Sequence, residues 1–223
     1  MKKWLKQEKN KLHGLSASQK LRYVWDYYKL WIIGIVALFM FSGYIVTNYR
    51  NANRDNHIYV AFVNTMAELG EGSDFWEGYV SCSGVDVKEE TVTFDTENYF
   101  DMTKNNVTGN HYYEKVVVLI DSKTADALVM ETKNLVALGR SGRLIDLNNE
   151  KTKQLMERYS DRLITTEVAD EDGTTREVPV GIDISDSRLV TRDRAYEECA
   201  LGISETIDDV QAVEEFLAYL IGE

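Results

Sequence analysis

The sequence predicts an α/β protein in which one N-terminal transmembrane helix precedes a single three-layer α/β domain with a mixed sheet. Three observations support this fold class. An uncharged run of eighteen residues lies near the N-terminus, β-rich and helical patterns alternate after it, and one apolar run is too continuous for a half-exposed strand. About 170 residues follow the uncharged run, enough for one domain with a sizeable core.

The uncharged run, Leu30 to Thr47, is expected to cross a lipid bilayer. At 1.5 Å per residue it spans roughly 27 Å, close to the thickness of the hydrocarbon layer. A permanent anchor is favoured over a cleaved signal peptide, because the basic region before the run is about thirty residues long. Cleavage near Ala37 or Ser42 is the alternative.

The distribution of charge predicts the orientation of the span. Residues 1–29 contain eight basic and two acidic residues, whereas only Arg50 and Arg54 stand close behind the run. Basic residues concentrate on the cytoplasmic side of membrane proteins. We therefore expect a cytoplasmic segment at 1–29, a transmembrane helix at 30–47, a tether at 48–57 and an extracytoplasmic domain at 58–223.

The part of the chain after the span is strongly acidic. From Asn51 onward it contains 16 basic and 35 acidic residues, a formal charge of −19. Nucleic acid is excluded as an expected partner, because its binding depends on Lys and Arg side chains that neutralise phosphates. Cationic solutes, metal ions and basic proteins remain possible partners. The alternative is that the negative charge only keeps the domain soluble.

The first half of the domain begins with a β-rich apolar run. His57 to Asn64 is predicted to be a strand, and Met66 to Cys82 is predicted to be a helical stretch with a glycine-rich break. Glu90 to Thr96 alternates between apolar and polar residues and is predicted to be a half-buried strand. Asp101 to Glu114 is predicted to be a loop.

The next segment predicts a central strand and the ligand site. The run "KVVVLID", Lys115 to Asp121, is predicted to be a strand covered on both faces. Ser122 is then expected to cap a helix, Lys123 to Leu138. Ligands of parallel α/β sheets bind at the carboxyl ends of strands. Asp121 and Ser122 are therefore the predicted ligand-binding residues.

The segments after this helix complete the predicted domain. Gly139 is expected to end the helix in a left-handed conformation, and Gly142 to Leu147 to return to the sheet. A hairpin is expected around Asp172-Gly173. The remaining predicted elements are strands at Arg162–Val168, Arg176–Ile184 and Ala200–Ser204, a short strand at Ser187–Thr191, and a closing helix in "TIDDVQAVEEFLAYLIGE".

The order of four motifs resembles a known family. "KVVVLID", "GRLIDL", "REVPVGIDIS" and "CALGISETIDDVQAVEEFLAYLIG" together resemble the first lobe of extracytoplasmic solute-binding proteins of bacterial ABC importers. "LRYVWDYYK" is similar to the segment before the span in uncharacterised single-pass membrane proteins of Gram-positive bacteria. The resemblance implies one lobe of a periplasmic-binding-protein fold. Only about twenty residues separate Pro179 from Ala200, where a second lobe would lie, so no ligand residue is transferred.

Motifs for catalysis and metal binding are absent from the sequence. Neither H-E-x-x-H nor G-x-S-x-G occurs, and Asp170 and Asp172 form only part of a calcium loop. Cys82 and Cys199 can form one disulfide or remain two buried thiols. We expect no catalytic residue, no metal site and no cofactor.

Two function hypotheses follow. The first is a non-catalytic, membrane-anchored extracytoplasmic module that binds a protein partner or a small solute at the cell surface, as an accessory to a transport or envelope complex. The alternative is an envelope hydrolase or transferase with unidentified catalytic residues. An enzyme is expected to gather titratable groups with shifted pKa values in one pocket, whereas a binding module is expected to present an open groove or an apolar patch.

Overall fold

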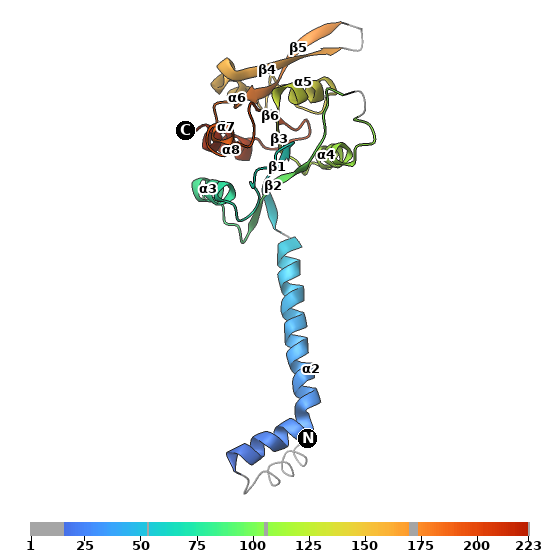
Figure 1. Cartoon of the computed structure of the whole chain (residues 1–223), viewed down its shortest axis with the longest axis vertical. Helices are drawn as coiled ribbons and strands as arrows, with labels where there is room; N and C mark the ends of the chain where they lie inside the picture. The colour runs from blue at the N-terminus through green and yellow to red at the C-terminus, as the bar shows by residue number, and fades with distance from the viewer. Residues whose placement is uncertain (1–15, 53, 105–106, 170–173, 223) are drawn as a thin grey trace. The chain divides into compact units, whose positions relative to one another are not determined.

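The computed structural model describes residues 16–52, 54–104, 107–169 and 174–222. The chain divides into two compact units, Met1–Arg54 and Asp55–Glu223 (Figure 1). The turn expected around Asp172-Gly173 and the partial calcium loop lie outside the described residues, as does most of the predicted basic segment.

The first unit contains one long helix, α2 (Ala17–Ala52). Within it Trp25–Tyr49 is long and apolar enough to cross a membrane. The helix continues into the residues that were predicted to form a tether, and the first strand begins at Asp55. Neither proline nor glycine occurs between Gly43 and Asp55, so nothing in the sequence interrupts the helix early.

The second unit is an α/β domain built on a single mixed sheet of six strands in the order β2-β1-β3-β6-β5-β4. β1 pairs in parallel with β2 and β3, and the remaining neighbours pair antiparallel. The elements are β1 (Asp55–Val63), α3 (Asp74–Ser83), β2 (Glu90–Asn98), α4 (His111–Asp121), β3 (Ala127–Met130), α5 (Thr132–Arg140), α6 (Lys153–Arg158), η1 (Ser160–Arg162), β4 (Leu163–Ala169), β5 (Thr175–Asp183), α7 (Arg188–Thr191), β6 (Ala200–Ile203) and α8 (Gln211–Ile221).

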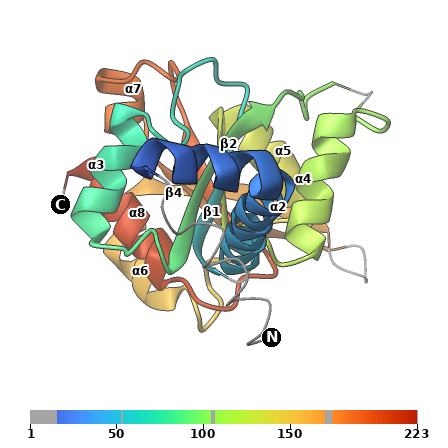
Figure 2. The same cartoon turned by 90° about the horizontal axis from the view of Figure 1, so that it is seen from below.

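Helices cover both faces of the sheet, which confirms the α/β fold class and the mixed sheet. Successive residues of β1 alternate between two cores: Val60 and Phe62 belong to one, and Ala61 and Val63 to the other. The first core includes side chains from α3, α6, α7 and α8, and the second includes side chains from α4 and α5. Figures 1 and 2 show these two groups of helices on opposite sides of the sheet.

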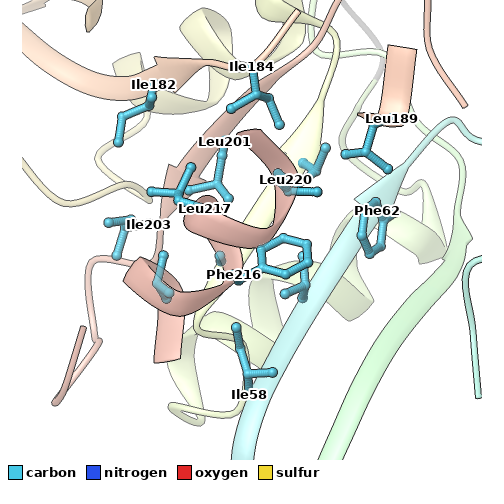
Figure 3. Close-up of a cluster of buried hydrophobic side chains, with 14 of the residues drawn as sticks. Ile58, Phe62, Ile182, Ile184, Leu189, Leu201, Ile203, Phe216, Leu217 and Leu220 are labelled. Carbon is cyan, nitrogen blue, oxygen red and sulfur yellow. The ribbon is translucent and has the colours of Figure 1, made fainter. Parts of the chain in front are cut away.

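The larger core is centred on α8. Phe216, Leu217 and Leu220 project from this helix onto the sheet, as Figure 3 shows. The ring of Phe216 lies 5.2 Å from that of Phe94 and 5.6 Å from that of Tyr79, measured between centroids. Aromatic pairs at such separations stabilise a core beyond the area that they bury.

The run "KVVVLID" is helical, so its prediction as a central strand is wrong. It forms the last two turns of α4, whose first turn is capped by Asn110: the Asn110 side chain accepts hydrogen bonds from the backbone amides of Tyr112 and Tyr113. Only Val116 and Ile120, one helical turn apart, are fully buried in this helix.

The strand that does lie in the middle is β3, inside the segment Lys123 to Leu138 that was predicted to be one helix. All four of its residues are buried, and helix α5 begins only at Thr132. Gly139 lies inside α5, and the left-handed residue after the helix is Gly142 instead. From Gly142 to Leu147 the chain does return to the sheet, through one isolated bridge between Leu144 and Ser204 and a hydrogen bond from the Leu147 amide to the carbonyl oxygen of Pro179 in β5.

The other predicted elements differ less from the structure. The hairpin of β4 and β5, the last strand β6 and the closing helix α8 are confirmed. The helical part of Met66 to Cys82 is limited to α3, which Ser73 caps. Ser187 to Thr191 is the short helix α7 with its cap, not a strand. Cys82 is exposed and Cys199 is buried, and both are free thiols.

Candidate functional site

The two predicted ligand-binding residues lie at the end of a helix. Asp121 is the last residue of α4 and forms an ion pair with Arg143, and Ser122 is the C-cap, whose hydroxyl lies 2.9 Å from that of Thr124. The structure brings the two residues together in one turn. The segment that ends at Asp121 is a helix and not a strand, so the argument from a strand end does not apply to these residues. Ligand binding by them stays a prediction.

The crevice that α/β sheets normally offer to ligands is filled by the chain itself. The connections from β1 to β2 and from β2 to β3 leave in opposite directions, so the topological switch lies between β1 and β3. At its carboxyl end the hydroxyl of Tyr196 donates to the carbonyl oxygens of Val63, at 2.9 Å, and Val129, at 3.2 Å. Burial raises the pKa of Tyr196, which keeps the donor protonated.

The opposite end of the sheet has an open pocket of about 620 Å³. It lies at the amino ends of β1, β2 and β3, between the end of α3 and the start of α8. We call it the acidic pocket. Its lining residues are Asn56, His57, Ser83, Gly84, Val85, Asp86, Glu90, Lys123, Ala125, Asp126, Thr206, Ile207, Asp208, Asp209, Gln211, Ala212 and Glu215.

Local structure explains how these residues meet. Parallel pairing aligns the starts of β1 and β2, with Asp55 opposite Glu90. Gly84 ends α3 in the left-handed conformation, φ 71°, and so turns the chain along the pocket. Lys123 also has a positive φ, 58°, in the turn from α4 to β3. Glu215 reaches the pocket from the second turn of α8.

His57 lies among acidic side chains at the pocket wall. Its Nδ1 is 3.8 Å from Oε2 of Glu90, and its Nε2 is 3.5 Å from Oε2 of Glu215. The hydroxyl of Tyr79 lies 3.2 Å from Nε2. The imidazole thus lies between the carboxylates of Glu90 and Glu215 and the core residue Tyr79. A protonated ring would be attracted to both carboxylates.

Asp126 is a half-buried carboxylate of the acidic pocket. Its Oδ2 accepts hydrogen bonds from the backbone amide of Tyr59, at 2.7 Å, and from the side-chain amide of Asn56, at 3.2 Å. Burial raises the pKa of Asp126 above its usual value, against the opposing effects of these two donors and of the nearby His57. The charged form is therefore disfavoured in the folded domain.

This raised pKa predicts a pH-dependent effect of Asp126→Asn. The folded state binds the Asp126 proton more tightly than the unfolded state, so this group stabilises the domain below about pH 4 and less as the pH rises through the raised pKa. The neutral variant keeps an oxygen that can accept both hydrogen bonds. We expect the difference in melting temperature, variant minus wild type, to be more positive at pH 7 than at pH 3.5.

Thermal unfolding followed by Trp76 fluorescence measures this difference when Trp4, Trp25 and Trp31 are replaced by Phe in every protein compared, because Trp76 is the one tryptophan of the second unit. The exposed Asp161 provides the control variant, Asp161→Asn. An equal difference between Asp126→Asn and wild type at both pH values would contradict the prediction.

The charge of the acidic pocket favours cationic ligands. Six carboxylates and one lysine line it, which gives a formal charge of −5 with His57 neutral. The lysine, Lys123, is paired with Asp208 at 3.0 Å, and the pKa of Asp208 is lowered by that ammonium group. An ionised carboxylate accepts hydrogen bonds and donates none. The groups complementary to the pocket are therefore cationic donors, ammonium and guanidinium.

A metal-binding arrangement is not seen in the part of the chain that the structure describes. No group of three or more His, Cys, Asp or Glu side chains there could hold a metal ion. Burial raises the pKa of the Cys199 thiol to about 12, which makes it a poor nucleophile near neutral pH.

Sequence reasoning missed the residues of the acidic pocket. The sequence pattern predicts that Asp126 lies in the interior of a helix, and it indicates for Glu90 and Glu215 only a strand and the closing helix. One usable signal was the position of Asp126 directly before the apolar run "ALVM", because a polar residue there marks a strand start. Glu90 and His57 begin predicted strands in the same way.

The fold and the pocket define the class of protein: an α/β domain, preceded by one apolar helix, with an acidic pocket at the amino ends of its parallel strands. No family model matches the chain, and no curated protein or solved structure is significantly similar to it. The resemblance to a solute-binding lobe and to single-pass proteins of Gram-positive bacteria stays a prediction.

Proposed function

We propose that this chain is a single-pass membrane protein whose extracytoplasmic domain is a non-catalytic binding module, accessory to a transport or envelope complex. The apolar helix Trp25–Tyr49 supports membrane anchoring. At 1.5 Å per residue its 25 residues extend about 37 Å, enough to cross the roughly 30 Å hydrocarbon layer and enter the headgroup regions.

The excess of basic residues before this helix supports a cytoplasmic N-terminus and an exported second unit. In this orientation the acidic pocket lies outside the cell, where solutes and surface proteins can reach it.

The observation that carries the binding role is the acidic pocket itself. Its volume of about 620 Å³ lies within the usual range of ligand sites, roughly 300 to 1,000 Å³. His57, Glu90 and Glu215 meet there from three different elements, so the site depends on the folded domain. The ligand is a cationic group, carried either by a free solute or by a partner protein.

A thermal-shift experiment tests this proposal with the full chain in lipid nanodiscs. Spermidine, arginine and a lysine-rich peptide are the cationic probes, and citrate and glucose are the controls. A ligand at ten times its Kd stabilises the folded state by about 1.4 kcal/mol, which shifts the midpoint of a domain of this size by about 3–5 °C. We expect this shift with at least one cationic probe and none with citrate or glucose.

Two variants localise the response. Glu215→Gln removes one pocket carboxylate and is expected to weaken binding about threefold to tenfold, as for the loss of a hydrogen bond that contributes about 1 kcal/mol. Glu150→Gln makes the same change at an exposed residue outside the pocket and is expected to leave binding unchanged. Equal responses of the two variants, or a flat response to all cations, would contradict the proposed site.

A further inference from the structure

Helix α2 changes direction along its length. Figures 1 and 2 show that its first turns, in dark blue, run in a different direction from the long remainder of the helix. The sequence changes character in the same part of the helix. Charged and aromatic residues fill "KLRYVWDYYK", and almost only apolar residues follow it.

A hollow of about 510 Å³ lies against this helix and is lined by Ser18, Leu21, Arg22, Trp25 and Ile32. Ser18 and Ile32 are fourteen residues apart, which corresponds to about 21 Å along a straight helix. One compact hollow can include both residues when the helix bends toward it. The described residues that line the hollow all belong to the first unit.

The described residues of the lining combine apolar groups with one cation. Leu21, Trp25 and Ile32 contribute apolar surface, and Arg22 contributes a guanidinium group that is always charged. From Ala17 to Lys29 the helix carries three basic residues and one acidic residue. This arrangement is complementary to an amphipathic molecule with an anionic head.

We propose that this hollow binds one anionic phospholipid of the leaflet in which the N-terminal part of α2 lies. The guanidinium of Arg22 pairs with the phosphate, since Arg matches phosphate oxygens with two parallel hydrogen bonds. The indole of Trp25 lies at headgroup depth, where amphipathic rings concentrate, and the first acyl carbons contact Leu21 and Ile32. The inference rests on the membrane anchoring proposed above.

Lipid-selective fluorescence quenching tests this proposal in the full chain. Trp4, Trp31 and Trp76 are replaced by Phe, so that Trp25 is the single reporter, and the protein is reconstituted in phosphatidylcholine vesicles. Brominated phosphatidylglycerol or brominated phosphatidylcholine is then added as the quencher. Because each basic residue near an anionic surface contributes on the order of 1 kcal/mol, we expect phosphatidylglycerol to be preferred about threefold to fivefold at Trp25.

Variants of Arg22 separate a specific site from general attraction. Arg22→Gln is expected to reduce the preference to about onefold to 1.5-fold, and Arg22→Glu to reverse it. Lys20→Gln removes the same charge from a residue outside the hollow and is expected to leave most of the preference. Raising the salt concentration to 1 M is expected to weaken the preference of the wild type, because the Debye length falls to about 3 Å.

The outcomes distinguish the lipid site from the anchor. Equal quenching by the two lipids, or the same loss in Arg22→Gln and Lys20→Gln, overturns the lipid site and leaves the anchor in place. Both proposals are overturned if neither lipid quenches Trp25 and alkaline carbonate extracts the protein from the vesicles. Selective quenching that depends on Arg22 supports both.

Discussion

Replacement of Phe216 by alanine is expected to lower the free energy of unfolding of the second unit by about 3–5 kcal/mol, the usual range for a large buried aromatic residue. Phe216 is fully buried and its ring lies within 6.3 Å of those of Phe62, Phe75, Tyr79 and Phe94. The substitution removes the apolar surface of one ring and leaves a cavity that α8 and the sheet cannot close completely.

Denaturant unfolding of the full chain in detergent, with Trp4, Trp25 and Trp31 replaced by Phe so that Trp76 is the single reporter, measures this loss. Trp76 lies in α3 and its indole donates to the carbonyl oxygen of Val92, so it reports on the second unit. Circular dichroism is less specific for the second unit, because 36 of the 87 described α-helical residues belong to α2, which the detergent preserves. Phe216→Leu, which retains most of the volume, is expected to lose clearly less stability. Equal losses in the two variants would contradict this account of the core.

Gly181→Ala is expected to destabilise the domain by up to about 3 kcal/mol, through overpacking instead of a cavity. A Cβ atom at Gly181 would lie 2.5 Å from Cδ2 of Leu135 and 2.8 Å from the backbone oxygen of Leu201. The leucine side chain can rotate away, but the carbonyl belongs to β6, which pairs with β5 at the next position. Relief of the contact would therefore separate two strands of the sheet.

Gly70→Ala is the matched control for this prediction. A Cβ atom there would meet only the backbone oxygen of Phe94, at 3.7 Å, which is an ordinary contact. The control is expected to be neutral or slightly stabilising, because alanine reduces the freedom of the unfolded chain. The same denaturant titration measures both variants. A loss at position 70 as large as that at position 181 would show that the tight contact is not the cause.

The sequence was sufficient to predict the fold class and much of the element order, and it failed where short apolar runs are ambiguous. "KVVVLID" satisfies the composition of a strand, yet Val118 is 62% exposed and Val116 and Ile120 are buried one helical turn apart. The contacts that decide for a helix are the cap at Asn110 and the packing of α4 on the sheet. Neither can be inferred from the seven-residue run alone.

The prediction of a helix where the structure has β3 failed for the opposite reason, because residues of a strand matched a helical pattern. Leu128 and Val129 fitted a helical stripe, but they lie on opposite faces of the sheet, in different cores. A four-residue strand that is buried on both faces has no alternation to reveal it. The acidic pocket was missed for the same reason, because its position depends on where β3 begins and on which strands lie beside it.

The hydroxyl of Tyr196 has a further consequence for how the domain opens. Its two acceptors, Val63 and Val129, are 133 and 67 residues away in the chain. The nearby carbonyl of Ala195 also accepts a hydrogen bond from Thr65. The connection between β5 and β6 is thus joined to β1 and β3, two neighbouring interior strands of the sheet. The amide of Ala195, which donates to the carbonyl oxygen of Leu189, is therefore expected to exchange with solvent only when the core itself opens, so this part of the connection belongs to the cooperative folding unit of the domain.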